Sequence, residues 1–219
     1  MGECAEAEWI MLRHGLTRAN AERRYIGRTD EPLSEEGRRM LAEAAQAGVY
    51  AALGKAEVVL ESPMRRCVET RKLLLPERSA AQIPEWREIN FGVFEGKNYA
   101  ELKSLPEYNR WLDSMGSLPF PAGEGREAFG IRCMRGLERA FVLLAEYSPE
   151  RKPPLVVAVV HGGTIMAVLS ALTGENFFSY PCANGEGYRF HLRRADGAYE
   201  IANVDSFPWA RRERTNARA

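Results

Sequence analysis

The stretch that decides the fold is Trp9-Ile10-Met11-Leu12-Arg13-His14-Gly15, in which four apolar residues run directly into a cation, an imidazole and a glycine. Such a short apolar run is typical of a buried strand. Ligands of open α/β sheets bind in the crevice outside the carboxyl ends of the strands. The stretch therefore predicts a sheet with Arg13 and His14 at the edge where an active site would form.

The same arrangement occurs a second time. An apolar run from Leu155 to Val160 is followed by His161, Gly162 and Gly163. A single histidine in this context is more often a packed core residue. The chain has only three histidines, however, and two of them end apolar strands and precede glycine. This repetition favours one shared site.

Apolar runs alternate with helical patterns along the chain, which indicates βαβ units and a mostly parallel sheet. The pair Asp196-Gly197 predicts a hairpin, so the last two strands would form an antiparallel edge. The expected fold class is an α/β three-layer sandwich with helices on both faces of the sheet. Strands are expected at 8–13, 57–61, 155–160, 187–193 and 199–204, and helices from Ser34 to about Leu53, from Ser62-Pro63, over about 127–147, and from Gly163 to about Leu172.

Two of the expected helices show an apolar face that should pack on the sheet. In the first, this face comprises Met40, Leu41, Ala44, Ala45, Val49 and Ala52. In the helix at 127–147 it comprises Ile131, Met134, Leu137, Phe141 and Leu144.

The 219 residues suffice for one substantial core, and we expect a single domain over 1–219. Segment 91–125 is rich in proline, glycine and aromatic residues and interrupts the alternation of strands and helices. It is expected to be a cap-like insertion over the active site. The basic tail at 210–219 is expected to be a solvated, disordered end.

The formal net charge is zero, so no overall field favours nucleic acid or a membrane as partner. No apolar run approaches the roughly 18 residues needed to span a bilayer, and the first residues do not resemble a secretory signal. The four cysteines are widely spaced, which predicts neither a disulfide framework nor a zinc site. We expect a cytoplasmic protein without metal or cofactor. The oligomeric state stays open, with a dimer as one option. The cysteines are Cys4, Cys67, Cys133 and Cys182.

Four motifs follow one another along the chain. The first is Leu12-Arg13-His14-Gly15-Leu16-Thr17 with Asn20, and the second is Ser62-Pro63-Met64-Arg65-Arg66-Cys67-Val68-Glu69-Thr70. The third is Glu88-Ile89-Asn90-Phe91-Gly92-Val93-Phe94-Glu95-Gly96, and the fourth is the strand that ends in His161-Gly162-Gly163. In content and order, over about residues 8–175, they resemble the motifs of the histidine phosphatase superfamily, also called the phosphoglycerate mutase-like family.

This resemblance implies a phosphoglycerate mutase-like fold and phosphoryl transfer through a phosphohistidine. His14 would be the nucleophile, because a neutral imidazole can attack phosphorus. Arg13 and Arg66 would bind the phosphoryl group through their planar, multidentate guanidinium groups. His161 would donate to the transferring group. The resemblance further implies substrate binding by Asn20, Gly27 and Gly162, although Asn20 is nearly as well explained as a turn residue.

The leaving alcohol needs a proton donor, and two carboxyl groups compete for that role. Glu88 holds the family position of the acid. Glu95 lies seven residues later, and we expect it to hold the Phe91-Gly92 turn instead. Glu124 resembles the family's Pro-Gly-Gly-Glu-Ser motif, but Gly125 stands where the serine is expected, so any contact through that hydroxyl is in doubt.

Several neighbouring residues are expected to be structural. Arg65 should face away from the site, because successive helical residues point about 100° apart. His191, on an expected edge strand, is also interpreted as structural. Gly162 and Gly163 open a helix whose N-terminal amides would favour an anion. The sequence contains no Asp-x-Asp motif, no His-x-x-x-His pair and no Walker loop, so a metal-dependent mechanism fits poorly.

The sequence therefore predicts a metal-independent phosphomonoester hydrolase that acts on a small phosphorylated metabolite. The run Phe91-Gly92-Val93-Phe94-Glu95-Gly96 looks like that of small bacterial phosphatases, including those that act on α-ribazole 5′-phosphate. One alternative is a cofactor-dependent phosphoglycerate mutase, but such enzymes carry an arginine after the acid, where this chain has Ile89. The other alternative is a non-catalytic sensor of phosphorylated ligands, which would need a lost catalytic group.

Overall fold

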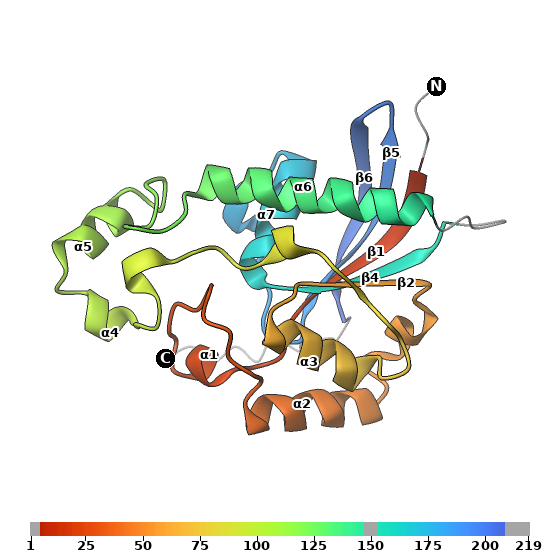
Figure 1. Cartoon of the computed structure of the whole chain (residues 1–219), viewed down its shortest axis with the longest axis horizontal. Helices are drawn as coiled ribbons and strands as arrows, with labels where there is room; N and C mark the ends of the chain where they lie inside the picture. The colour runs from red at the N-terminus through yellow and green to blue at the C-terminus, as the bar shows by residue number, and fades with distance from the viewer. Residues whose placement is uncertain (1–4, 147–152, 209–219) are drawn as a thin grey trace, which may run out of the picture.

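A six-stranded sheet runs through the middle of the molecule (Figure 1). The computed structural model describes residues 5–146 and 153–208. The strand order is β3-β2-β4-β1-β5-β6, in which β1 to β4 are parallel while β5 and β6 are antiparallel to their neighbours. The expected mixed sheet with an antiparallel edge is thus confirmed. The strands are β1 (Ala5–Arg13), β2 (Val58–Glu61), β3 (Ala81–Gln82), β4 (Leu155–Val160), β5 (Gly187–Ala195) and β6 (Ala198–Phe207).

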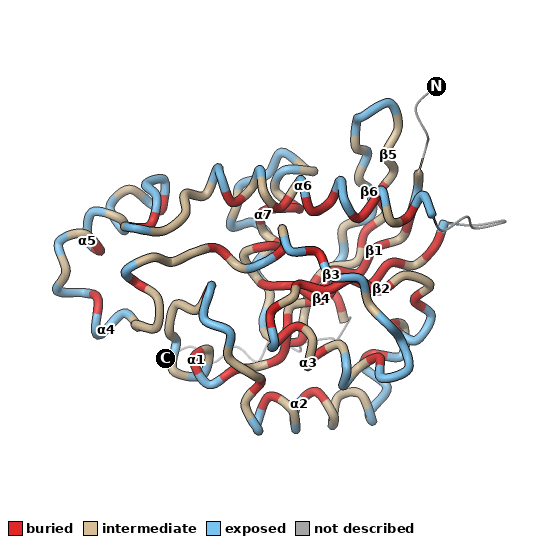
Figure 2. The backbone as a smooth tube through the Cα atoms, in the orientation of Figure 1, coloured by how far each residue is buried: buried red, intermediate tan, exposed pale blue. Residues whose placement is uncertain are grey.

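Side chains alternate between the two faces of β1 and are covered on both. Trp9 and Met11 belong to a core cluster shared with α6 (Arg126–Ala145) and α7 (Gly162–Thr173). Ile10 and Leu12 belong to a second cluster shared with α2 (Glu35–Gln46) and α3 (Arg65–Leu74). Figure 1 shows these two helix pairs on opposite sides of the sheet, and Figure 2 shows buried residues concentrated along the central strands. The expected three-layer sandwich is therefore confirmed.

Helix α2 begins as predicted but ends earlier. The Ser34 hydroxyl accepts a hydrogen bond from the Gly37 amide at 2.9 Å, which caps the helix. The helix ends at Gln46 because Gly48 adopts a left-handed conformation with φ of 76°, and Leu53 lies in a separate 3₁₀ turn, η1 (Ala51–Lys55). The expectation of one helix through Leu53 was wrong. Met40, expected on the packed face, is 50% exposed.

Two other helix predictions need correction. Helix α3 begins at Arg65 and not at Ser62-Pro63, because the Ser62 amide continues the sheet ladder by donating to the Val159 carbonyl. Helix α6 covers most of the predicted range, but Ile131 is 50% exposed. Its buried face instead includes the small residues Cys133, Gly136 and Ala140, together with Phe129, Leu137, Phe141 and Leu144.

The hairpin prediction holds at Asp196 and Gly197, whose φ values of 51° and 81° are the left-handed pair that a tight turn between β5 and β6 requires. Strand β5, which carries His191, is an inner strand because β6 covers its outer edge. His191 pairs with Glu6 at 2.7 Å.

None of the helices in the described ranges combines the length and apolarity needed to cross a membrane.

Segment 91–125 lies at one end of the molecule, beyond the sheet (Figure 1). Its aromatic side chains pack on one another, with Phe94 and Tyr108 buried. The predicted basic tail lies outside the described residues. The remaining short elements are α1 (Arg18–Ala21), η2 (Pro84–Trp86), η3 (Gly92–Phe94), α4 (Tyr99–Leu102), α5 (Pro106–Asp113) and η4 (Phe177–Ser179).

Helix α6 contains two glycines that we expect to respond oppositely to alanine. A Cβ on Gly136 would lie 2.5 Å from the indole nitrogen of Trp86, which is fully buried, whereas a Cβ on Gly130 would meet nothing within 4 Å. Gly130→Ala should raise the free energy of unfolding by up to ~1 kcal/mol through helix propensity. Gly136→Ala should lower it by ~1–3 kcal/mol through overpacking. Urea denaturation of both variants checks this, and equal stabilisation would contradict the packing of Trp86 on α6.

Candidate active site

The parallel pairing of β1 with β4 brings the two glycine-flanked histidines together. Arg13 is in register with Val160, so His14 and His161 leave adjacent strands at the same carboxyl edge. Their ring centroids lie 5.2 Å apart in an edge-to-face arrangement. Strand β2 adds Ser62, whose hydroxyl lies 2.8 Å from His161 Nε2. Ser62 occurs in the second motif, but the sequence did not indicate this contact.

The tautomer of His14 follows from one hydrogen bond. Its Nδ1 lies 2.8 Å from the Gly15 carbonyl oxygen, and because a carbonyl only accepts, Nδ1 carries the proton. The Nε2 atom is then the unprotonated nitrogen. Burial lowers the pKa of His14 well below its usual range, and the charges of Arg66 and Arg13 lower it further. His14 is therefore a neutral imidazole with its lone pair on Nε2, which is the form needed for nucleophilic attack.

Arg66 is a cation buried to 1% exposure. Its Nε donates to His161 Nδ1 at 3.3 Å, and its terminal nitrogens donate to the carbonyls of Thr29 and Gly27 at 2.9 and 3.0 Å. Within the described part of the chain, neither Arg66 nor Arg13 forms an ion pair. Two cations without carboxylate partners therefore border the His14 ring, which favours a bound anion such as a phosphoryl group.

Arg13 reaches the site beside Gly162. One terminal nitrogen donates to the Cys182 carbonyl at 2.8 Å, while its buried Nε has no partner among the described residues. A Cβ on Gly162 would lie 3.4 Å from that Nε, so glycine leaves room for the guanidinium. Arg65, by contrast, is exposed and pairs with Glu69, as expected for the neighbour that faces away.

Both ring nitrogens of His161 have protein partners. Because Arg66 Nε donates to Nδ1, the proton of the neutral ring lies on Nε2, which donates to the Ser62 hydroxyl. Burial, followed by the charge of Arg66, lowers the pKa of His161 well below its usual range. A role for His161 as donor to a phosphoryl oxygen therefore requires one of these contacts to be exchanged when phosphate binds.

Glu88 lies over the N-terminus of α7. Its two carboxyl oxygens accept from the amides of Ile89 and Gly163 at 2.9 and 3.1 Å. Burial raises the pKa of Glu88, while these two amides and the nearby arginines oppose the shift. A Cβ on Gly163 would come within 2.2 Å of Glu88 Oε1, so the glycine permits this approach. The helix N-terminus that we expected to attract an anion is thus already in contact with a carboxyl group.

Arg132 on α6 holds the loop that carries Glu88, a role that no pattern in the sequence indicates. Its guanidinium donates to the carbonyls of Glu85 and Arg87 at 2.7 and 2.8 Å and pairs with Glu124 at 2.7 Å. Glu124 also accepts from the Asn90 amide. The loop is therefore held by the Glu124 carboxylate and Arg132, so it does not depend on the hydroxyl that Gly125 lacks.

Glu95 is connected to Arg66 through the loop at 27–29. One of its carboxyl oxygens accepts from the amides of Gly27 and Thr29 at 2.8 and 2.9 Å. The carbonyls of the same two residues accept from Arg66, so Glu95 positions the buried cation. The expectation that Glu95 holds the Phe91-Gly92 turn was wrong, because this side chain bonds to a different loop.

Gly27 is packed tightly, since a Cβ there would lie 1.8 Å from the Ile89 carbonyl oxygen. Both of its backbone polar groups have protein partners, so direct substrate binding by Gly27 stays a prediction.

Asn20 is part of a capping box with Thr17, and its Oδ1 also accepts from Asn184. Asn184 also donates to the His14 carbonyl. In the sequence, this residue is marked only by the turn-forming pair Asn184-Gly185.

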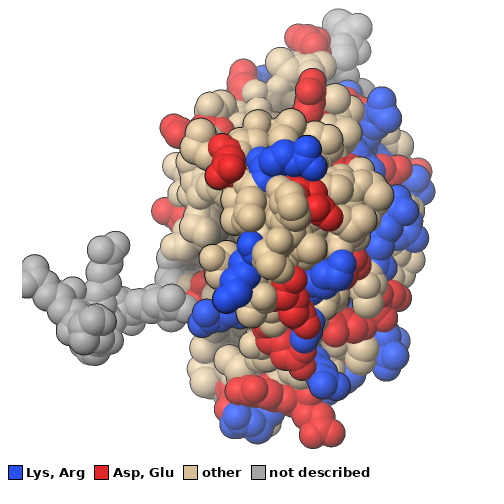
Figure 3. Space-filling model, turned by 90° about the vertical axis from the view of Figure 1, so that its left-hand side faces the viewer, with Lys and Arg blue, Asp and Glu red and all other residues tan. Residues whose placement is uncertain are grey.

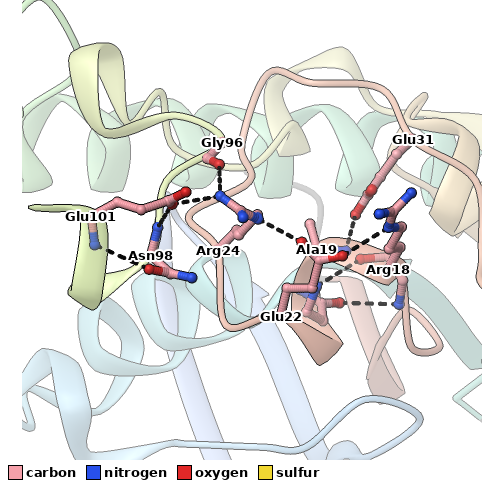
Figure 4. A network of polar contacts seen from close by, with 10 residues as sticks. Arg18, Ala19, Glu22, Arg24, Glu31, Gly96, Asn98 and Glu101 are labelled. Atoms are coloured by element: carbon pink, nitrogen blue, oxygen red, sulfur yellow. Dashed lines mark hydrogen bonds and ion pairs between the residues drawn. The ribbon is translucent and has the colours of Figure 1, made fainter.

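A polar cavity of about 440 Å³ opens beside Arg13 and Asn20 and is also lined by Arg23 and Arg24. Arg24 is already engaged there, because it pairs with Glu22 and Glu101 and donates to a backbone carbonyl (Figure 4). Over the described ranges, no three side chains of metal-binding type gather into one cluster.

Comparison with known proteins agrees with the four motifs. The sequence profile of the histidine phosphatase superfamily (branch 1) matches residues 9–204. Glucosyl-3-phosphoglycerate phosphatase of Mycolicibacterium vanbaalenii is 28% identical over 200 residues, which cover 86% of each chain. The 2,3-bisphosphoglycerate-dependent phosphoglycerate mutase 2 of Gloeobacter violaceus is 29% identical over 171 residues, or 74% of each chain. The solved structure of the α-ribazole phosphatase from Shigella flexneri has a TM-score of 0.69 at 23% identity, covering 90% of this chain and 95% of that one.

We expect His14 and His161 to be neutral and to be opposite tautomers at neutral pH. Long-range proton–nitrogen-15 spectra should show His14 protonated on Nδ1 and His161 on Nε2, with His14→Gln and His161→Gln used for assignment. Because the folded-state pKa of both is lowered, the unfolded chain binds protons first as the pH falls. The contribution of these two histidines to the free energy of unfolding should therefore be fully present above about pH 6.5 and be lost as the pH falls below it. A charged His14 at pH 7 would contradict this electrostatic account.

Proposed function

The chain belongs to branch 1 of the histidine phosphatase superfamily, and from this premise we propose that it is a phosphatase that hydrolyses phosphomonoesters through a phosphohistidine on His14 without a metal ion. The observation that carries the proposal is the neutral His14 ring, with Nδ1 fixed by the Gly15 carbonyl, beside two guanidinium groups that form no ion pair with any carboxylate of residues 5–146 and 153–208. This combination presents a nucleophile and positive charge to the same phosphoryl group.

In the proposed first step, His14 Nε2 attacks phosphorus and the bond to the leaving oxygen breaks. Arg13 and Arg66 stabilise the charge on the phosphoryl oxygens. Glu88 donates a proton to the leaving oxygen, for which its raised pKa is suited. In the second step, water attacks the phosphohistidine and Glu88 accepts the proton of that water. The products are an alcohol and inorganic phosphate, and both His14 and Glu88 return to their starting forms.

Hydrolysis is favoured over the mutase reaction by the residue after the acid. Ile89 stands where cofactor-dependent mutases carry an arginine, and its side chain is 7% exposed among apolar neighbours. A second anionic group of a bisphosphate would therefore find no cation at this position. The sensor alternative has no support, because none of the groups needed for the two steps is replaced.

We further propose that the chain is a single domain in which segment 91–125 forms a cap. The protein would act on a small phosphorylated metabolite in the cytoplasm. Free thiols at Cys67, Cys133 and Cys182 agree with a reducing compartment. α-Ribazole 5′-phosphate is one candidate substrate, supported by the phosphatase-like run at 91–96. No nucleic-acid or membrane partner is proposed. The substrate should be sought by screening phosphorylated metabolites of different chemical classes.

Labelling with a radioactive phosphate ester tests the nucleophile and the metal independence together. In excess EDTA, the wild-type protein should hydrolyse the ester and acquire an acid-labile, base-stable phosphoryl label. His14→Ala should acquire no label and lose turnover, whereas the control His191→Ala should keep both, because His191 lies on β5 and its ring contacts Glu6 at 2.7 Å. Label retained in His14→Ala would identify a different nucleophile, and activity restored only by Mg²⁺ or Mn²⁺ would contradict the metal-free mechanism.

The two carboxyl groups should be distinguished by their dependence on the leaving group. An alkyl phosphate needs a proton donor far more than p-nitrophenyl phosphate does. Glu88→Gln should therefore reduce kcat/KM by ~10²–10⁴-fold for the alkyl ester and much less for the aryl ester. Glu95→Gln should affect both esters alike, because Glu95 acts through the position of Arg66. The reverse pattern would show that Glu95 is the acid.

A further inference from the structure

A second cavity, of about 320 Å³, shares Tyr25 with the polar cavity beside Arg13 but has otherwise different lining residues. Most of its wall consists of aromatic and aliphatic side chains. They come from three parts of the chain: the loop after α1, residues 89–120, and the region from α7 to η4. Prominent among them are Tyr25, Phe91, Trp111, Leu118, Phe120 and Phe178.

The proposed acid connects this cavity to the reaction. Glu88 and Gly163, which contact each other at the N-terminus of α7, both line it. The polar cavity beside Arg13, in contrast, has no carboxyl group among its described lining residues. An acid must lie next to the oxygen that it protonates. The body of the leaving alcohol would therefore extend into the aromatic cavity, while the phosphoryl group stays with Arg13 and Arg66.

The charges around the cavity do not favour an anionic leaving group. Among the described lining residues, Arg126 is the only cation. Its guanidinium already lies over the rings of Phe177 and Phe178, at 5.3 and 5.0 Å, and donates to the Met115 carbonyl. On the surface at this end of the molecule, acidic and basic side chains are interspersed (Figure 3). A carboxylate buried here would lose its hydration without gaining a free partner.

Contacts among its own side chains hold part of the cavity wall in place. The Tyr25 hydroxyl lies 3.1 Å from that of Tyr108, and the Tyr25 ring packs 5.1 Å from Phe91. Trp111 stacks on Phe120 at 4.7 Å. Leu118 and Phe178 are 49% and 55% exposed, so they are the lining side chains with the most apolar surface left for a ligand to cover. A preformed aromatic wall with uncovered apolar surface is typical of a site for an apolar ligand.

We propose that this cavity receives the leaving group and selects phosphate esters of alcohols that carry a bulky apolar, planar body over esters of short anionic alcohols such as glycerate. The assignment rests on the proposed phosphatase function for its catalytic role. Leu118 and Phe178 are specificity-determining residues in this scheme. The chemistry is unchanged: the phosphorus–nitrogen bond forms, the phosphorus–oxygen bond breaks, and the apolar alcohol takes its proton from Glu88.

The test compares 3-phenylpropyl phosphate, n-propyl phosphate and 3-phosphoglycerate, all of which need a proton on an alkyl leaving oxygen. The phenylpropyl ester should have the highest kcat/KM, about 10- to 100-fold above the propyl ester, from burial of the ring. Leu118→Ala and Phe178→Ala should each reduce this ratio by about 3- to 10-fold. Leu112→Ala is the matched control, because Leu112 is 41% exposed on α5 and does not line the cavity.

Calorimetry with 3-phenylpropylphosphonate and propylphosphonate gives a readout that needs no turnover. Tighter binding of the phenyl compound, weakened in Leu118→Ala and not in Leu112→Ala, supports the cavity assignment. If every ester resists hydrolysis while this binding preference persists, the phosphatase proposal fails and the cavity assignment stands. Hydrolysis without preference, a preference for 3-phosphoglycerate, or equal binding of the two phosphonates overturns the cavity assignment.

Discussion

Arg66 is a cation removed from water without a carboxylate to neutralise it in the described structure, and much of the site is arranged around it. Burying such a charge is unfavourable unless its donors are satisfied. The backbone carbonyls of Gly27 and Thr29 and the ring of His161 accept its hydrogen bonds. These neutral acceptors satisfy the donors but leave the positive charge in place. Burial keeps the two imidazoles neutral, the residual charge of Arg66 lowers their pKa further, and the same charge makes the site suited to an anion.

Each group proposed to take part in the reaction is held by a residue from a distant part of the chain. Glu95 fixes the loop that holds Arg66, Arg132 fixes the loop that carries Glu88, and Thr70 accepts from the Gly15 amide next to His14. Most of these contacts end on backbone amides or carbonyls, so they set the path of the loops directly. Preorganisation of this kind lets a site stabilise developing charge without rearrangement during the reaction.

The sequence predicted the sheet and the two histidine positions well, because apolar runs and glycine-flanked histidines are local patterns. Helix ends were harder. Helix α2 ends before Leu53 because Gly48 adopts a left-handed conformation. Helix α3 begins after Ser62-Pro63 because the Ser62 amide donates a hydrogen bond to a neighbouring strand. Arg132 and Asn184 were missed for the same reason, since the carbonyls that Arg132 holds belong to Glu85 and Arg87, at least 45 residues away along the chain, and Asn184 contacts His14, 170 residues away. Nothing in a single sequence marks such contacts.

The two halves of the site are built from different kinds of structure. The proposed phosphoryl chemistry uses residues at the carboxyl edge of the sheet, where strand register sets the distance between His14 and His161. The cavity proposed for the leaving group is lined largely by short helices and loops of segment 91–125, whose side chains can change without altering that register. Glu88 contacts both halves, since its carboxyl group is held by α7 and lines the cavity. Substrate preference can therefore vary with the cavity wall while the acid and the nucleophile keep their positions, which is how one fold can accommodate different leaving groups.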